Sequence, residues 1–139
     1  MYQSVTLFLA AVLLFPALLL GQNSTSDFNT FFDTFKTAVA QKNTVTLTKL
    51  MASRFDFMYA VNVPRADVFE GLDSDSGQQW TNLQQAVKNT PVIHNGNGPY
   101  KSSRVLQCVP NQPIYQCLVV FDKDSQNRWR WKAMVMPSR

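Results

Sequence analysis

The pattern of apolar positions begins with one long run at the N-terminus. Residues 5–20 are apolar except for Thr6, and no charged side chain occurs before Asp27. The run has the length of a secretory hydrophobic region, is short for a membrane span and is interrupted by Pro16. We therefore predict a signal peptide over residues 1–21 and a secreted or periplasmic protein.

Two features of this leader leave an alternative open. No Lys or Arg lies near Met1, so only the amino terminus supplies the positive charge that signal peptides carry there. Cleavage after Gly21 would also place Leu19 at a position where a small residue is usual. The alternative is a leader that stays uncleaved and anchors the protein to a membrane. The remaining residues, 22–139, are predicted to form a single domain.

Helical spacing dominates the first part of that domain. Ser26 is a plausible N-cap of the first helix, and Asn43 is predicted to end it in a left-handed conformation. A second short helix is predicted to start near Thr44, with Leu47, Leu50 and Met51 facing inward. The apolar stripe of the first helix consists of Phe28, Phe31, Phe32, Phe35, Ala38 and Val39.

In the middle of the chain, the spacing of apolar residues changes from helical to strand-like and then back to helical. Residues 55–60 alternate between large apolar and other side chains, which predicts a strand. A short helix is then predicted from Pro64 through Glu70, followed by a break at residues 73–77. A longer helix comes next and ends before Pro91. Its inward face is predicted to carry Trp80, Leu83 and Val87.

Three strands are predicted after the loop at residues 95–99. They cover residues 104–109, 114–121 and 128–136. Alternation along the last strand predicts one face with Trp129, Trp131, Ala133 and Val135 and an opposite face with Arg128, Arg130 and Lys132.

The two cysteines, Cys108 and Cys117, flank a predicted turn at residues 110–113. A tight connection there would place them opposite each other on antiparallel strands, close enough for a disulfide. In an exported protein we expect that bond to form. The alternative is a pair of buried thiols.

Charge restricts the classes of partner. The chain carries 13 basic and 9 acidic residues, a formal net charge of +4, and the basic excess lies toward the C-terminus. No run of five like charges occurs, which argues against nucleic-acid binding. The basic excess permits anionic partners, but we prefer a solvated strand face as its explanation.

Taken together, the elements predict an α+β fold in which helices pack on a curved antiparallel sheet. Three segments, 31–39, 47–51 and 55–57, and the tryptophan-rich end at 129–134 resemble small exported members of the nuclear transport factor 2-like (NTF2-like) superfamily. The resemblance extends over residues 27–136. It implies a cone-shaped domain with a pocket between the helices and the concave sheet, and it does not imply one activity.

For this pocket we expect a small apolar or sugar-like ligand that is bound rather than transformed. The candidates for its lining are aromatic: Phe57, Tyr59, Trp80, Tyr115, Trp129 and Trp131. We assign no catalytic residue and no cofactor. We also assign no metal, because His94 is the only histidine and no metal-ligand spacing occurs.

Two alternatives to ligand binding stay open. An isomerase or dehydratase of the ketosteroid-isomerase type would need Asp56 or Asp67 as a base, facing a donor such as Tyr59, Tyr100 or Tyr115 in the pocket. A protein-interaction module, such as a homodimer, would instead use the open face of the sheet and would expose a contiguous apolar patch there.

Overall fold

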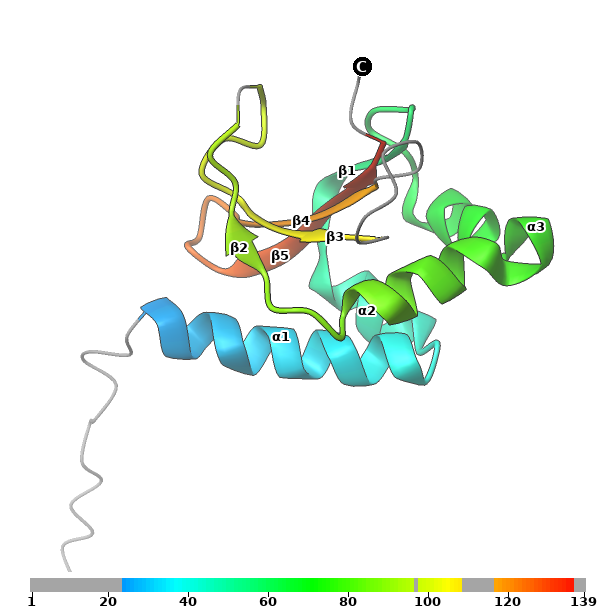
Figure 1. Ribbon diagram of the computed structural model, residues 1–139, viewed down its shortest axis with the longest axis horizontal. Helices are drawn as coiled ribbons and strands as arrows, with labels where there is room; N and C mark the ends of the chain where they lie inside the picture. Colours follow the sequence, from blue (N-terminus) through cyan, green and yellow to red (C-terminus); the bar gives the residue numbers. More distant parts are fainter. Residues whose placement is uncertain (1–23, 97, 109–116, 137–139) are drawn as a thin grey trace, which may run out of the picture.

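The computed structural model describes residues 24–96, 98–108 and 117–136 (Figure 1). The predicted signal peptide lies outside these residues. These residues form two helices, a strand, a third helix and four further strands, so the predicted α+β class is confirmed. None of the helices in the described ranges combines the length and apolarity needed to cross a membrane. The elements are α1 (Ser24–Ala40), α2 (Thr44–Leu50), β1 (Met51–Met58), α3 (Arg65–Ala86), β2 (Val92–Ile93), β3 (Arg104–Gln107), β4 (Leu118–Lys123) and β5 (Trp129–Val135).

The five strands form one sheet in the order β1-β5-β4-β3-β2. Strands β2 to β5 are an antiparallel meander, of which β3 to β5 were predicted, but β1 pairs with β5 in parallel. The sheet is therefore mixed, and the expectation of a wholly antiparallel sheet is wrong. No tight turn joins β1 to β5, so the hairpin constraint that makes neighbouring strands antiparallel does not act on this pair.

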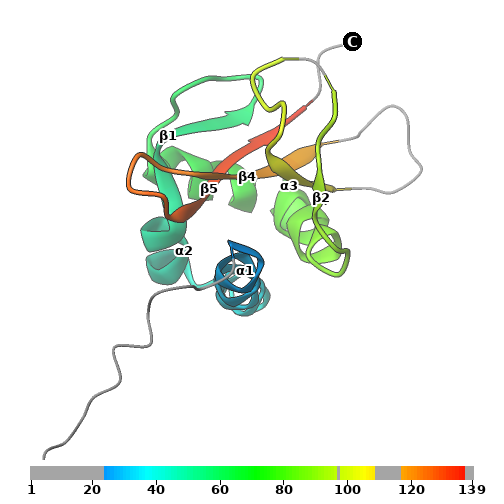
Figure 2. The ribbon, with the colours of Figure 1, turned by 90° about the vertical axis from the view of Figure 1, so that its left-hand side faces the viewer.

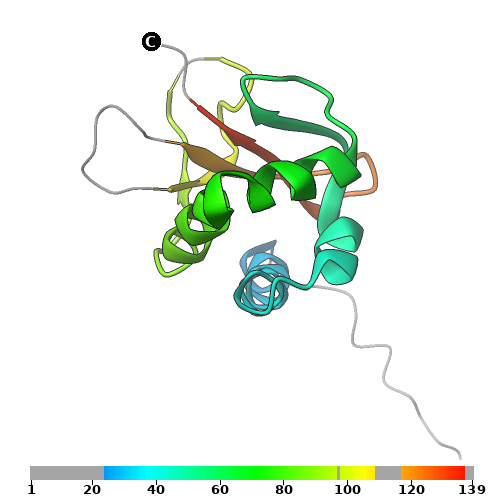
Figure 3. The same cartoon turned by 90° about the vertical axis from the view of Figure 1, so that its right-hand side faces the viewer.

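All three helices lie on one side of the sheet (Figures 2 and 3). We call the covered side the helix face. Its core consists of side chains from every helix and from all strands except β2, and aromatic rings fill much of it. Phe121 lies edge-on to Phe35 at 5.0 Å between ring centroids, and Trp131 lies edge-on to Phe55 at 4.7 Å.

The other side of the sheet, the open face, carries none of the helices formed by the described residues. A small cluster of Val105, Val120, Ala133 and Val135 lies there beneath the half-buried Tyr100 and Leu118. Figure 2 shows the connections after β1 and after β2 rising on this side, opposite the helices. Within the described residues, the sheet thus has a helical layer on one face and loops on the other.

The helical predictions hold with corrections at the ends. α1 begins at Ser24, two residues before the predicted cap at Ser26. The left-handed residue after α1 is Lys42, with φ 49°, and not Asn43. Asn43 instead accepts a 3.1 Å hydrogen bond from the Thr46 N–H and caps α2, a role that a short side-chain amide suits well. Met51 is buried as predicted but starts β1 rather than ending the helix.

The predicted break between two helical segments is confirmed inside α3. Ser74, Asp75, Ser76 and Gly77 have non-helical backbone angles, and the last three have positive φ. The short strand β2, in contrast, was not predicted from the sequence. With only two residues it offers no alternation to detect.

The predicted face of the last strand is wrong because of a β-bulge. Phe121 pairs with Trp131, but the preceding Val120 pairs with Ala133, so Lys132 is an extra residue on β5. The extra residue reverses the alternation. Trp131 therefore lies on the helix face together with the fully buried Met134, while Ala133 and Val135 lie on the open face.

The disulfide between Cys108 and Cys117 is confirmed. Their Cα atoms are 5.1 Å apart, and the Cys108 N–H donates to the Cys117 carbonyl at 2.9 Å. Both side chains are buried on the helix face with Leu106, Val119 and Phe121, as the pairing predicts. Such bonds form and persist in oxidising environments.

Candidate functional site

Two of the six aromatic residues predicted to line a pocket are buried in the helix-face core. Trp131 has no exposed surface and Trp80 almost none. The indole N–H of each ring has a hydrogen-bond acceptor within the protein: Trp80 donates to Asp73 Oδ1 at 2.7 Å, and Trp131 donates to the Ala133 carbonyl at 3.1 Å. These rings fill the space between helices and sheet, where the resemblance placed the pocket.

Phe57, Trp129 and Tyr59 lie in three other places, and Tyr115 lies outside the described residues. The Phe57 ring packs on Gly71 of α3. The centroid of the Trp129 ring lies 5.5 Å from the Arg104 guanidinium and 5.4 Å from the Lys123 ammonium. Tyr59 is 83% exposed, after the end of β1. The five described residues therefore do not surround one cavity.

A cavity that contains one of them, Tyr59, opens on the other side of the sheet. Its volume is about 420 Å³, within the usual size range of small-molecule sites. We call it the open-face cavity. The ends of β1, β4 and β5 and the two loops above the sheet supply its walls. The larger apolar side chains are Met58, Tyr59, Val61, Leu118, Val135 and Met136.

Three polar side chains reach this cavity: Asp56, Tyr100 and His94. Asp56 lies there because it pairs with Ala133, so strand alternation points it away from the buried Phe55. The alternation of residues 55–60 along the chain favours the same direction. His94 is half-buried beside the loop that carries Tyr100.

Asp56 and Tyr100 form the strongest polar contact of the site. The Tyr100 hydroxyl donates to Asp56 Oδ2 at 2.8 Å, while Asp56 Oδ1 accepts the Asn62 N–H at 2.9 Å. Burial, and then the hydrogen bond to the Asp56 carboxylate, raise the pKa of the Tyr100 phenol above its usual value. The carboxylate thereby ties both loops to the end of β1.

This geometry bears on the isomerase-type alternative. An Asp within reach of a Tyr is the arrangement that the alternative requires, but here the two groups bind each other. Both carboxylate oxygens already accept hydrogen bonds, and the phenol proton is directed at the carboxylate. Neither group is poised to act on a third molecule without breaking this pair. Asp67, the other candidate base, is exposed on α3.

A second depression of about 510 Å³ adjoins the open-face cavity, since both are lined by His94 and Leu118. Its wall includes the strand β2, whose Val92 and Ile93 are 61% and 56% exposed. Val61 on the far side is 79% exposed. Large apolar side chains thus project on both sides of the cavity.

Sequence reasoning missed most residues of this site. Val61, Met58 and Met136 come from strand ends and a loop, where no periodicity marks them. The available signal was an apolar turn, because Val61 directly follows Met58, Tyr59 and Ala60. Among the described residues, no group of three His, Cys, Asp or Glu side chains could hold a metal ion.

Comparisons with protein-family models, curated proteins and solved structures found no match to this chain.

Proposed function

We propose that the protein is an exported binding module of NTF2-like architecture that holds a small apolar ligand in the open-face cavity. The observation that carries the proposal is the lining: apolar walls, with the Asp56–Tyr100 pair and His94 at one side. Ligand sites typically combine such walls with a few fixed polar groups that orient the ligand.

The position of the cavity differs from the one that the resemblance implies. Between the helices and the sheet, the rings of Phe35, Phe55, Phe121 and Trp131 pack at ring-centroid distances of 4.7–5.2 Å. A ligand there would have to displace core side chains, at a cost of several kcal/mol. The open face requires no such displacement, which favours it as the binding surface.

Export is supported by two independent features. The apolar leader at residues 1–21 has the length of a secretory signal, and the Cys108–Cys117 disulfide is the kind of bond that oxidising compartments preserve. Expression of the full chain with a C-terminal reporter, followed by mass analysis of any exported product, tests cleavage after Gly21. An uncleaved, membrane-bound product would favour the anchor instead.

Ligand binding is tested with the neutral apolar dye Nile red and then with a panel of apolar small molecules in thermal-shift assays, because a ligand of the folded state raises the melting temperature. We expect Val61→Arg to weaken dye binding by about tenfold, which corresponds to ~1.4 kcal/mol. The matched control is Val45→Arg, at a valine that is 65% exposed on α2 and outside the cavity. Equal binding by both variants would contradict the proposal.

A second candidate function is a homodimer through the same face. The exposed Tyr59, Val61, Val92 and Ile93 favour it, because large apolar side chains gathered on one face mark interaction surfaces. Light scattering across a range of concentrations distinguishes the two. A dimer would double the mass, and Ile93→Arg would restore the monomer, whereas a ligand-binding monomer would keep its mass in both proteins.

A further inference from the structure

Another concave surface lies away from the open-face cavity. It has a volume of about 610 Å³ and lies between the end of α2, the first half of β1, the start of α3 and the turn that joins β4 to β5. Figure 2 shows α2, β1 and this turn gathered on one side of the molecule. We call it the cationic cleft because of the side chains that line it.

Charge is concentrated in this cleft. Seven basic side chains line it against two carboxylates, Asp122 and Asp124, a formal net charge of +5. The whole chain carries +4, so everything outside the cleft together carries −1. The basic excess that the sequence shows toward its C-terminus is therefore joined in space by Lys49, Arg54 and Arg65 from the N-terminal half.

Several of these cations are held in place by the fold. Arg130 donates to Asp124 Oδ2 at 3.0 Å and to the Lys49 carbonyl at 2.8 Å, which ties the β4–β5 turn to α2. Arg65 donates to the Ala52 carbonyl at 3.3 Å. A guanidinium fixed in this way loses little conformational entropy when it binds an anion.

Other cations of the cleft lack a carboxylate partner. Lys49 and Arg54 are exposed, and neither forms an ion pair with any described residue. The two carboxylates are already shared: Asp124 pairs with Arg128 and Arg130, and Asp122 lies 3.7 Å from Lys132. The cleft therefore keeps an uncompensated positive potential, which attracts anions.

We propose that the cationic cleft binds a short oligomer that carries several sulfate or phosphate groups. Four of its seven cations are arginines, whose planar fork matches tetrahedral oxyanions bidentately. The concave shape suits a chain segment better than a flat bilayer. No aromatic side chain lines the cleft, so single-stranded nucleic acid finds no stacking platform there.

The test is calorimetric titration of the purified protein with a sulfated dextran oligosaccharide and, separately, with tripolyphosphate, at low and at high ionic strength. We expect binding at low salt that weakens as salt rises. The double variant Lys49→Gln/Arg54→Gln should weaken it by about tenfold or more, because it removes two of the four cleft cations that form no ion pair with a described carboxylate. Tight binding of only one probe would identify sulfate or phosphate as the source of the oxyanion and would support the site.

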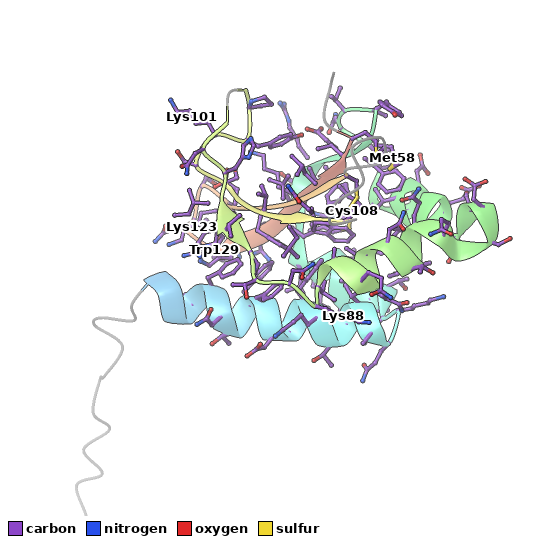
Figure 4. All side chains as sticks on the ribbon, viewed as in Figure 1. Met58, Lys88, Lys101, Cys108, Lys123 and Trp129 are labelled. Atoms are coloured by element: carbon purple, nitrogen blue, oxygen red, sulfur yellow. A yellow bond between two sulfur atoms is a disulfide. The ribbon has the colours of Figure 1, made fainter. Side chains whose placement is uncertain are left out.

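A control variant that loses the same charge outside the cleft distinguishes binding in the cleft from a general effect of net charge. Lys88→Gln/Lys101→Gln removes two exposed lysines at the end of α3 and on the loop after β2, both outside the cleft (Figure 4). We expect it to change the affinity less than threefold. The proposal is overturned if neither probe binds at low salt, if both double variants weaken binding equally, or if oligothymidylate or anionic vesicles bind more tightly than both probes.

Discussion

Tyr100 donates a 2.8 Å hydrogen bond to Asp56 across 44 residues of sequence, and this contact fastens the loop after β2 to the end of β1. Asp56 also holds the backbone of Asn62, so one carboxylate fixes both loops that rise above the open face. The open-face cavity lies between those loops. The Asp56–Tyr100 pair therefore contributes to the shape of this cavity, together with the backbone hydrogen bonds inside each loop.

We expect Tyr100→Phe and Asp56→Ala each to lower the free energy of unfolding, because each leaves the partner with one hydrogen bond fewer. A double-mutant cycle should give a coupling of roughly 1 kcal/mol, the net value of such a bond in a half-exposed position. Chemical denaturation of the four proteins measures it. Additive effects would mean that the two side chains do not stabilise each other.

Replacement of Gly71 even by alanine is predicted to lower the free energy of unfolding. A Cβ at Gly71 would meet the ring of Phe57, so Gly71→Ala should destabilise the fold by about 1–3 kcal/mol despite the higher helix propensity of alanine. In a Phe57→Ala background the obstacle is gone. There the same change should become neutral or stabilising in denaturant melts. A cost that persists without Phe57 would refute the explanation.

We predict that the fold needs an inserted residue at position 132 but does not need the lysine side chain there. Deleting Lys132 would turn Trp131 toward the open face, so we expect a loss of about 3–5 kcal/mol, as for loss of a buried tryptophan, or no folding at all. Lys132→Ala should cost less than about 1 kcal/mol, because its ion pair with Asp122 is exposed. Thermal melts followed by circular dichroism compare the stability of the deletion variant with that of Lys132→Ala.

Acid stability should depend on Asp124. The N–H of Arg128, then the Arg130 side chain and the N–H of Gln126, donate to its carboxylate and hold the pKa of Asp124 well below its usual range. The carboxylate thus stabilises the folded state at pH 7, and this contribution is lost as the pH falls below about 4, the ordinary pKa in the unfolded chain.

Accordingly, Asp124→Asn should melt at a lower temperature than the unmodified protein at pH 7, and the difference should narrow between about pH 4 and pH 2. The matched control is Asp67→Asn on the exposed surface of α3, which should show a small difference at every pH. A constant difference for Asp124→Asn would contradict the assignment.

Local patterns in the sequence determined the helices and the disulfide. The apolar stripe of α1, which is rich in phenylalanine, repeats at helical period over several turns. These side chains leave water only when that face of the helix is buried against the rest of the domain. The break at residues 74–77 follows from residues that favour turns over helix. Cys108 and Cys117 are close in sequence, so one turn is enough to pair them.

The tertiary structure alone decided which face each residue of β5 occupies and what lies on the open face. A single unpaired residue, Lys132, reverses the faces of the strand, and no local pattern marks it. The Asp56–Tyr100 pair and the cationic cleft join segments that are far apart along the chain. Their proximity depends on the order in which strands add to the sheet, and that order results from packing over the whole domain rather than from local periodicity.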